Sequence, residues 1–546
     1  RQELPGVAIR VEPLRYYPNE SLAGHVLGYI HSINQQELSD ASGDKYNINS
    51  LIGKTGIEKQ YEQELRGKDG ARRVEVDAKG RPVRELVTLE PKPGNNIYLT
   101  LDMDLQKVLE NSMEETLKNL QQRYPKAKVG SAVVLNVKTG EVLAMYSSPS
   151  MYPDDWKGEL GTDRASYYYP QGTQYDPMSP GAETNRAIQV SYPPGSTFKP
   201  ITGMAALEKG EVDSLTDLVT CKGSYWIAPY IKYIKCWSVH GNVNYYAAMA
   251  GSCNVYFQEM GRRAGKEEII RVAAEFGLGQ KTGIDIPGEI SGQLPTPAWK
   301  KEVNAALINR KYEQLREQLD DKYRILLKNA KDEKERGSLE KQEKSEKARL
   351  EAQYKIDYNF DTTWQPFDTF NMSIGQGSNE FTVLQLTNYC ATIANGGYLM
   401  QPYIAKKIVS DNGRLIKEFK PQVIRETKVA PETIAETKRA MLAVTQPKGT
   451  AHFLFYQFPP EIQVAAKTGT AETGRAGDNS MKEFHGVFIA FAPFDDPEIA
   501  FAGVVEYGYS GGESAGIVCR DVFEQYFGIK DHLAEEDKNM ANTTGE

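Results

Sequence analysis

Two apolar stretches near opposite ends of the chain predict a central β-sheet. Residues 131–137 and 141–146 are mostly apolar and flank a Lys-Thr-Gly turn, which is the pattern of a β-hairpin. Residues 486–492 and 499–505 flank a turn rich in Pro and Asp and predict a second hairpin. Because the sequence between the hairpins is mostly helical, we expect one sheet made from both chain ends, with helices from the middle packed on it.

Helical spacing is clear in two other segments. Residues 102–120 carry apolar residues three and four positions apart, which predicts an amphipathic helix. Residues 301–356 are dense in Lys, Glu, Arg and Gln and carry only a narrow apolar stripe at helical spacing. We expect this charged segment to form a protruding helical hairpin that turns at Gly337. It would be either a solvated appendage or an arm that binds a partner, and the sequence favours neither.

The remaining pattern divides the chain into domains. Residues 1–95 have the pattern of short strands and turns without a dense apolar core, and the composition changes at residues 91–95. We therefore expect an extended β-rich platform domain at 1–95, truncated at its N-terminus, followed by a larger domain at 96–530. Residues 531–546 are polar and predict a disordered tail. The predicted fold class is α+β: an antiparallel sheet with helices packed on it, plus a helical subdomain.

Composition narrows the class of protein. The chain has 546 residues, is 40% hydrophobic and 25% charged, and carries a net charge of −8. This is the balance of a globular protein of two or three domains, without the basic surface that nucleic-acid binding needs. No apolar run approaches the ~20 residues of a membrane helix. The chain begins at Arg1 without Met, and we expect a truncated start rather than a processed mature one.

The first candidate for chemistry is Ser196-Thr197-Phe198-Lys199, which follows Pro-Pro-Gly. Residues three positions apart share a helix face, so the Lys199 amine would lie near the Ser196 hydroxyl. A serine is a weak nucleophile that needs an adjacent base, and a lysine serves once burial or another cation lowers its pKa. The tetrapeptide alone is weak evidence, because Ser-x-x-Lys also occurs at two other places in the chain.

Two further short motifs follow along the chain. Ser252-Cys253-Asn254 offers a hydroxyl that can relay protons and an amide that can hold a substrate peptide group. Lys467-Thr468-Gly469-Thr470 ends an apolar strand, so a cation and two hydroxyls would lie on a strand edge, where they suit a substrate carboxylate. Gly469 would let a substrate backbone approach closely. Each motif is common by itself, whereas all three in this order are far more specific.

This ordered set resembles the active-site motifs of class B penicillin-binding proteins, the transpeptidases that cross-link peptidoglycan. The resemblance covers roughly residues 1–530, apart from the charged segment 301–356. Residues 53–70 resemble the platform module that precedes the catalytic domain in this family. Residues 484–499 are similar to the branch of the family that acts in cell elongation. Other stretches that carry the resemblance are 193–200, 373–377 and 467–472.

The resemblance implies a D,D-transpeptidase that works through a serine acyl-enzyme. Ser196 would attack the penultimate D-Ala carbonyl of a stem pentapeptide, and Lys199 would accept its proton. Ser252, between Lys199 and Lys467, would pass a proton to the leaving D-Ala. The backbone N–H groups of Ser196 and Thr470 would form the oxyanion hole, and a β-lactam would mimic D-Ala-D-Ala and trap Ser196. No cofactor is implied. The residues implied in holding the substrate or the β-lactam are Asn254, Thr468, Gly469 and Thr470.

The resemblance also implies a location and partners. The substrates would be peptidoglycan stem peptides on glycan strands derived from lipid II. The partners would be a membrane glycosyltransferase of the SEDS family and other proteins of the elongation machinery, and no nucleic acid is implied. We expect the catalytic domain on the extracytoplasmic face of the cell membrane, held by a single N-terminal anchor that is absent from this chain.

Three other functions share parts of this pattern. A D,D-carboxypeptidase differs only in the acceptor, so it stays open as an alternative. A β-lactam-sensing receptor would be acylated without turning over peptides. A β-lactamase uses the same groups, but it also needs a water and a base placed for rapid deacylation. The chain is also too long, with too large a platform, for that last class.

Five cysteines are too few for a disulfide framework. Outside the cytoplasm, a disulfide between Cys221 and Cys236 is the favoured interpretation, and its loop of about 15 residues would be worth ~3 kcal/mol in the chain-entropy model. The alternative is a metal site of Cys221, Cys236 and His240, because some relatives hold zinc between the first two motifs, although no fourth ligand is evident. The remaining cysteines are predicted to be core thiols: Cys253, Cys390 and Cys519.

Overall fold

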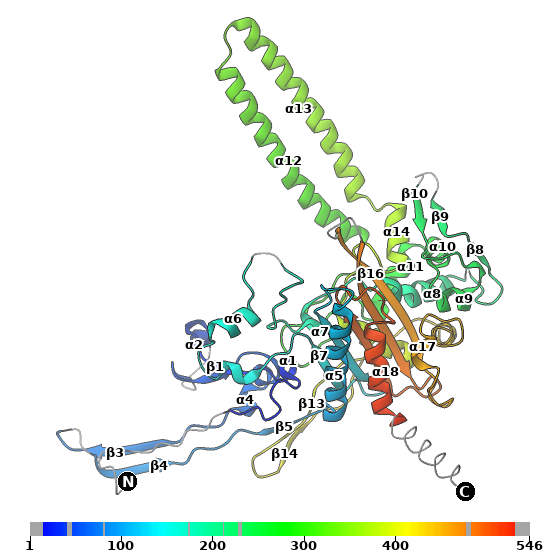
Figure 1. Ribbon diagram of the computed structural model, residues 1–546. Helices are drawn as coiled ribbons and strands as arrows, with labels where there is room; N and C mark the ends of the chain where they lie inside the picture. The colour runs from blue at the N-terminus through cyan, green and yellow to red at the C-terminus, as the bar shows by residue number, and fades with distance from the viewer. Residues whose placement is uncertain are drawn as a thin grey trace, which may run out of the picture.

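The computed structural model describes residues 15–40, 46–79, 82–172, 175–210, 212–227, 232–476 and 482–529 (Figure 1). The tail predicted at 531–546 lies outside these residues. Within the described part, a large domain is built around one sheet, a smaller platform lies beside it, and a pair of long helices projects away from the large domain.

A five-stranded antiparallel sheet forms the centre of the large domain. Its strand order is β16-β17-β18-β6-β7, so the prediction that both hairpins share one sheet is confirmed. The pairing of β18 with β6 joins the hairpins, with Ile499 opposite Asn136 and Val505 opposite Gly130. The strands are β6 (Gly130–Asn136), β7 (Val142–Ser147), β16 (Ala465–Ala476), β17 (Lys482–Ala492) and β18 (Ile499–Val505).

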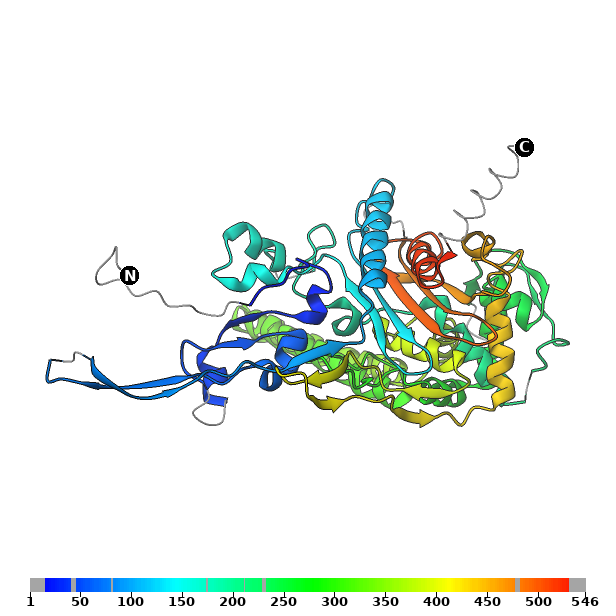
Figure 2. The same ribbon diagram turned by 90° about the horizontal axis from the view of Figure 1, so that it is seen from below.

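Helices cover both faces of this sheet (Figure 2). α5 (Met103–Gln121) and α18 (Ala515–Tyr526) pack on each other and on one face. α15 (Val383–Ala394), which is buried at every residue, packs on the other face. Asp102 caps α5 by accepting hydrogen bonds from two backbone N–H groups of the first turn. The amphipathic helix predicted in this region is therefore confirmed as α5.

A layer of helices beside the sheet forms the helical subdomain. α8 packs on α10, α11 and α16, and α10 also packs on α14. These helices bring together parts of the chain that are far apart in sequence, because α8 and α10 each begin at one of the motifs. The helices are α8 (Lys199–Glu208), α10 (Asn254–Ala264), α11 (Lys266–Glu275), α14 (Pro366–Ser373) and α16 (Pro431–Leu442).

The platform is made of short elements and one long ribbon. The ribbon β3–β4 extends away from the rest of the platform and from the large domain (Figure 2). Hydrogen bonds that join the platform to the large domain include one from the Tyr61 hydroxyl to Asp285 at 2.7 Å and one from the Ala23 N–H to Glu110 at 2.8 Å. The elements are α1 (Gly24–Leu27), β1 (Ile30–Ser32), α2 (Gln35–Asp40), β2 (Leu51–Gly53), α3 (Gly56–Gln60), α4 (Glu62–Leu65), β3 (Ala71–Val76) and β4 (Pro82–Leu89).

The two projecting helices are α12 (Pro297–Lys328) and α13 (Glu333–Thr362), which occupy the segment where the sequence predicts a helical hairpin. The turn expected at Gly337 is wrong, because Gly337 lies inside α13. The chain instead turns at residues 329–332, where Asp332 caps α13 by accepting from the backbone N–H of Glu335 at 2.7 Å. A glycine inside a helix costs only ~1 kcal/mol, so a well-placed cap outweighs it.

The remaining elements complete the surface around these layers. β5, β13 and β14 form a three-stranded sheet in the order β14-β13-β5, and three two-stranded sheets are β8–β11, β9–β10 and β12–β15. No helix in the described ranges is both long enough and apolar enough to span a bilayer. The bounds are β5 (Asn96–Leu99), η1 (Pro153–Lys157), α6 (Thr162–Tyr168), α7 (Arg186–Gln189), η2 (Gly195–Phe198), β8 (Val219–Cys221), β9 (Ser224–Ile227), β10 (Lys232–Lys235), β11 (Gly241–Val243), α9 (Tyr245–Ala250), β12 (Tyr398–Met400), β13 (Ala405–Val409), β14 (Leu415–Glu418), β15 (Val423–Glu426) and α17 (His452–Phe455).

Candidate active site

The candidate nucleophile lies on a tight turn that leads into α8. Ser196 belongs to the 3-10 helix η2, and Lys199 is the first residue of α8. Residues three apart eclipse each other in a 3-10 helix, so Lys199 follows Ser196 on the same side of the turn. Ser196 is partly exposed, whereas Lys199 is fully buried. A substrate can therefore reach the hydroxyl while the amine is shielded from water.

Contacts from neighbouring elements hold this turn in place. Gly195 has a φ of 53°, and its backbone N–H donates to the Gly375 carbonyl at 3.0 Å. A Cβ on Gly195 would lie only 2.8 Å from the Thr470 carbonyl oxygen of β16. From the other side, the Tyr389 hydroxyl on α15 donates to the Thr197 carbonyl at 2.5 Å. The nucleophile turn is thus clamped against the strand that carries the third motif.

The Lys199 ammonium makes three hydrogen bonds, all to the second motif. Its Nζ donates to the Ser252 carbonyl at 2.7 Å, to the Ser252 Oγ at 3.1 Å and to the Asn254 Oδ1 at 2.7 Å. Asn254 begins α10, and the preceding turn aims Ser252 back at α8. The first and second motifs, more than fifty residues apart, therefore meet at one amine.

Ser252 also contacts the third motif and so bridges two lysines. The Lys467 Nζ donates to the Ser252 Oγ at 2.9 Å, the same oxygen that accepts from Lys199. Ser252 has a φ of 52°, which is the left-handed region that side chains other than glycine seldom occupy. Strain of this kind is found at sites where the surrounding structure fixes an unfavourable conformation for a purpose. Here it places one hydroxyl between two amines.

Burial shifts the pKa of both lysines downward. It lowers the pKa of Lys199 to about 8. Burial, together with the neighbouring Lys199, holds the pKa of Lys467 well below its ordinary value. Two cations sharing one buried hydroxyl disfavour each other's charged forms. The lowered pKa values make a neutral amine accessible near neutral pH. A neutral amine can accept a proton, which is what activation of a serine nucleophile requires.

The third motif lies along β16, beside the nucleophile turn. Thr468 is partly buried and Thr470 is exposed. A Cβ on Gly469 would lie 2.9 Å from the Pro194 carbonyl oxygen, so glycine is needed here for the packing of β16 against the turn. The approach of a substrate backbone to Gly469 stays a prediction.

Two residues that the sequence interpretation did not select also face this strand. The Gln376 Nε2 donates to the Thr470 carbonyl at 3.3 Å, and the Thr450 hydroxyl lies 2.8 Å from the Thr468 hydroxyl. Gln376 belongs to the 373–377 stretch that carried the resemblance, so its position at the site had a sequence indication. Thr450 had none, because it lies in an irregular loop between α16 and α17.

The predicted disulfide between Cys221 and Cys236 is wrong, because both residues are free thiols. Their sulfurs instead converge with two other groups, His240 and Cys253, and the four ligand atoms all lie within 4.8 Å of one another. The His240 Nδ1 lies 3.6 Å from the Cys221 sulfur and 3.5 Å from the Cys236 sulfur. Cys253, which was expected to be a core thiol, is the fourth potential metal ligand that the sequence interpretation did not identify.

The surroundings of this cluster fit a metal-binding donor set. Three cysteines and one histidine form a common set for structural zinc. The His240 Nε2 hydrogen-bonds to the Gly251 carbonyl at 2.9 Å, and Nδ1 faces the sulfurs. Metal-bound histidines commonly have this arrangement, in which one ring nitrogen binds the metal and the other bonds to a carbonyl or carboxylate. Backbone N–H groups donate to the Cys236 sulfur at 3.2 Å and to the Cys253 sulfur at 3.5 Å. The hydrogen bond from Cys253 lowers the pKa of the Cys236 thiol, which favours the thiolate form that binds metals.

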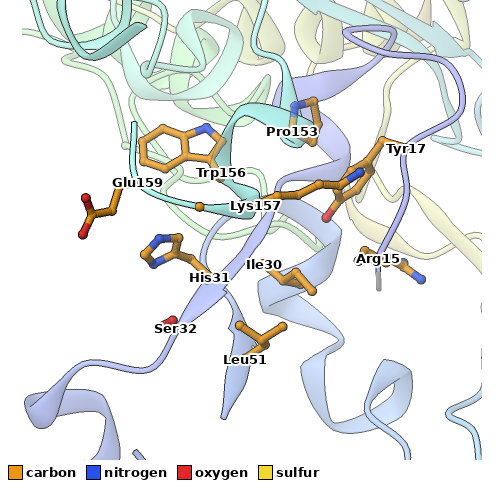
Figure 3. Close-up of a pocket in the computed structure, with 11 residues that line it drawn as sticks. Arg15, Tyr17, Ile30, His31, Ser32, Leu51, Pro153, Trp156, Lys157 and Glu159 are labelled. Atoms are coloured by element: carbon orange, nitrogen blue, oxygen red, sulfur yellow. The ribbon is translucent and has the colours of Figure 1, made fainter. Parts of the chain in front are cut away.

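A pocket of about 300 Å³ lies elsewhere, between the platform and η1 (Figure 3). Trp156 forms one wall, with its ring stacked on Tyr29 at 4.1 Å between centroids. None of the three motifs lines this pocket, so it is separate from the chemistry described above. Its lining residues are Arg15, Tyr17, Ile30, His31, Ser32, Leu51, Pro153, Trp156, Lys157, Gly158 and Glu159.

Comparisons with known proteins find matches for both parts of the chain. The model of the penicillin binding protein transpeptidase domain matches residues 130–524, and the model of the penicillin-binding protein dimerisation domain matches residues 1–99. The peptidoglycan D,D-transpeptidase MrdA of Acinetobacter baumannii is 30% identical over 541 residues, which are 96% of this chain and 68% of that protein.

Solved structures with the same fold give the same picture. The complex between penicillin-binding protein PBP2 and MreC from Helicobacter pylori matches with a TM-score of 0.68 at 26% identity, over 94% of this chain and 79% of that chain. A structure described as the structural coordination of polymerization and crosslinking by a peptidoglycan synthase complex matches with a TM-score of 0.70 at 27% identity, over 94% of this chain and 76% of that chain.

Proposed function

The chain belongs to the family of penicillin-binding protein transpeptidases, and from this premise we propose that it is the peptidoglycan D,D-transpeptidase of cell elongation. The observation that carries the proposal is the hydrogen-bonded series Lys199–Ser252–Lys467 behind the accessible Ser196. This series supplies a base, a proton relay and a second cation to one serine, which acyl transfer through a serine requires. Asn254 and the edge of β16 flank it, where a peptide donor would lie.

Acylation begins at Ser196. Lys199, in its neutral form, accepts the Ser196 proton as Oγ forms a bond to the penultimate D-Ala carbonyl carbon. Negative charge then develops on the carbonyl oxygen, and we assign its stabilisation to the backbone N–H groups of Ser196 and Thr470. The close contact of Gly195 with the Thr470 carbonyl supports this pairing, because it brings the two backbones together. Losing one such donor typically costs ~10²–10³ in rate.

Ser252 completes the step at the leaving group. Because its oxygen accepts from Lys199 and Lys467, its own proton is free to pass to the terminal D-Ala nitrogen as the C–N bond breaks. The proton that Lys199 took from Ser196 then replaces it. D-Ala leaves, and the amine of a neighbouring stem peptide attacks the ester carbon. The ester C–O bond then breaks, the proton lost by the amine passes to the Ser196 Oγ, and a new peptide bond is formed. A β-lactam follows the first half of this sequence and stays bound.

We assign recognition of the donor peptide to three side chains around the series. The Asn254 amide would hold a peptide group of the donor, since its Oδ1 already accepts from Lys199 and its Nδ2 faces outward to the Lys235 carbonyl at 3.4 Å. Thr468 and Thr470 would bind the terminal carboxylate, because they lie on the β16 edge beside the Lys467 cation. Gly469 keeps that edge close to the nucleophile turn.

We further propose that Cys221, Cys236, His240 and Cys253 bind a zinc ion in a structural role. A bound zinc would supply folding energy by tying β8, the loop after β10 and the start of α10 together. Since Cys253 lies between Ser252 and Asn254, the cluster would also fix the second motif. Metal analysis of the purified protein should find about one zinc per chain, and Cys253→Ser should lose it and lower Tm. Full metal loss with an unchanged Tm would contradict the structural role.

The proposed setting follows the relatives. The protein would act at the extracytoplasmic face of the cell membrane, held by an N-terminal anchor, on stem peptides of lipid II-derived strands. Structures of relatives in complex with MreC and in a peptidoglycan synthase complex support elongation-machinery partners, and we propose a SEDS glycosyltransferase among them. We place the platform at 1–95 and the transpeptidase domain at 96–530, with residues 301–356 as an insertion.

Mass spectrometry of the intact protein after penicillin treatment tests the assignment. The wild type should carry one stable penicilloyl adduct, and Ser196→Ala should carry none. Incubation with a stem pentapeptide and an amine acceptor should then release D-Ala and form the cross-linked product. Rapid penicillin hydrolysis without a lasting adduct would instead show a β-lactamase. Release of D-Ala without cross-linked product would show a carboxypeptidase, and acylation without any peptide turnover would show a receptor.

A further inference from the structure

A threonine outside the three motifs contacts one of them directly and also contacts the turn that leads into another. The Thr450 hydroxyl lies 2.8 Å from the Thr468 hydroxyl of the third motif. The Thr450 backbone N–H donates to the Ala250 carbonyl at 3.1 Å, two residues before Ser252. Thr450 therefore joins the strand edge at Thr468 to the turn that carries the second motif.

The loop that carries Thr450 is built to hold it in this position. Lys448 adopts a φ of 74°, a left-handed conformation that reverses the chain just before Thr450. The Ala451 N–H donates to the Val444 carbonyl at 2.9 Å, and a Cβ on Gly449 would lie 2.1 Å from that same carbonyl oxygen. The loop is closed on itself immediately before and after Thr450, so the Thr450 side chain has a fixed direction.

The number of hydrogen bonds that each hydroxyl can make suggests how Thr450 affects Thr468. A threonine hydroxyl has one proton to donate and two lone pairs to accept with. The Thr468 Oγ1 already faces the Lys467 Nζ at 3.5 Å, so this cation competes for a lone pair. When Thr450 donates to Thr468 as well, both lone pairs are engaged, and the Thr468 proton must point away from both donors, toward the open side of β16.

We propose that Thr450 is a positioning residue for carboxylate recognition: it donates its proton to Thr468 and so keeps the Thr468 proton aimed at the terminal carboxylate of the substrate. This inference rests on the proposed function and deepens it, because it extends the carboxylate-binding set beyond the motif to a loop of the helical subdomain. Thr450 acts through Thr468 and touches no reacting atom, so its effect belongs to binding of the carboxylate and not to acyl transfer itself.

The test compares Thr450→Val with Thr450→Ser on two probes of Ser196 acylation. One probe is benzylpenicillin, which carries a carboxylate, and the other is its methyl ester, which does not. For benzylpenicillin, Thr450→Val should weaken the dissociation constant that precedes acylation by about 3- to 10-fold, the loss of one hydrogen bond. The limiting acylation rate should stay unchanged, the methyl ester should react as with wild type, and Thr450→Ser should restore the wild-type values.

Thr445→Val is the matched control in the same loop. The Thr445 hydroxyl donates to the Leu442 and Val464 carbonyls, at 3.0 and 2.6 Å, and to no motif residue. This control should slow neither probe selectively. Equal slowing of both probes by Thr450→Val would overturn the inference and leave Thr450 a structural residue, as would no slowing of either. Failure of the wild type to be acylated by either probe would instead remove the proposed function itself.

Discussion

At the scale of single residues, Ser252 concentrates the chemistry of the site. It accepts hydrogen bonds from the amines of Lys199 and Lys467, and its backbone is held at a φ of 52° to do so. A left-handed conformation costs a residue with a Cβ roughly 1–2 kcal/mol, and glycine avoids this cost. In the proposed mechanism the Ser252 hydroxyl transfers a proton, which gives a reason for a strained serine at a position where glycine would be more stable.

Two substitutions separate these effects at Ser252. Ser252→Ala and Ser252→Gly should both lower turnover of a stem peptide by about 10²–10⁴-fold, the usual worth of a positioned proton donor. Ser252→Gly should nevertheless be the more stable variant by about 1 kcal/mol, because it relieves the left-handed strain that alanine keeps. Thermal unfolding and D-Ala release measure the two quantities. Equal stability of the two variants would show that the backbone stores no strain here.

The pKa of Lys199 predicts how acylation depends on pH. Burial lowers this pKa to about 8, and only the neutral amine can accept the Ser196 proton. Below about pH 8 the neutral fraction falls about tenfold per pH unit, so the rate of penicilloyl formation should rise with pH and level off above 8. The profile is measured from time courses of intact mass. Lys199→Arg, which keeps a cation, should abolish acylation at every pH, and a flat wild-type profile would exclude Lys199 as the base.

At the scale of elements, the features that could be predicted from the sequence are those set by local residue pattern or by the order of motifs along the chain. The two hairpins of the sheet and α5 were predicted because apolar spacing and turn residues are local properties. The three motifs were recognised because their order along the chain is specific. The place of Cys253 in the Cys/His cluster was missed because the other three residues lie 13 to 32 residues away and converge only when β8, β11 and α10 pack together. The turn at Gly337 was wrong because a side-chain cap at Asp332 competes with glycine.

The contacts of the α12–α13 hairpin predict that the active site works without it. Its helices contact each other along their length, and its base is closed by the Asn304 side chain donating to the Asp361 carbonyl at 2.7 Å. Replacing residues 305–360 by a short Gly-Ser linker should therefore leave the rate of Ser196 acylation within about twofold of wild type. A large loss of acylation in a folded deletion variant would contradict this prediction.

A substitution at the base of this hairpin tests whether the base, unlike the projecting part, is coupled to the catalytic domain. Lys300 pairs with Asp368 on α14 at 2.5 Å, and both side chains are largely buried. α14 leads directly into Gly375, whose carbonyl accepts from the nucleophile turn. Lys300→Met leaves the Asp368 charge buried without its partner, so it should lower Tm more than deletion of the hairpin does. The base, and not the length, of the hairpin is thus the part coupled to the catalytic domain.

At the scale of the whole molecule, the platform is joined to the transpeptidase domain by buried polar contacts. Asp285 accepts from the Tyr61 hydroxyl and also from two backbone N–H groups at the start of β13. On the other side, His25 of α1 is buried and its Nε2 hydrogen-bonds to the Ala182 carbonyl at 2.8 Å. The hydrogen bonds of Tyr61 and His25 each have a defined partner in the other domain. The orientation of the platform therefore depends on the protonation of the groups that form them.

His25 predicts a loss of stability in acid. Burial, together with the nearby Arg186, lowers its pKa from 6.5 in the unfolded chain to about 4 in the folded protein. Between these values the unfolded chain binds more protons, so the free energy of unfolding falls as pH falls from about 6.5 to about 4, by up to about 3 kcal/mol. His25→Gln keeps a donor for the Ala182 carbonyl without titrating. Its Tm should therefore depend less on pH across this range than the Tm of the wild type. Identical slopes for wild type and His25→Gln would mean that the platform contact at Ala182 survives protonation, and the acid sensitivity of the molecule would then have to arise outside this interface.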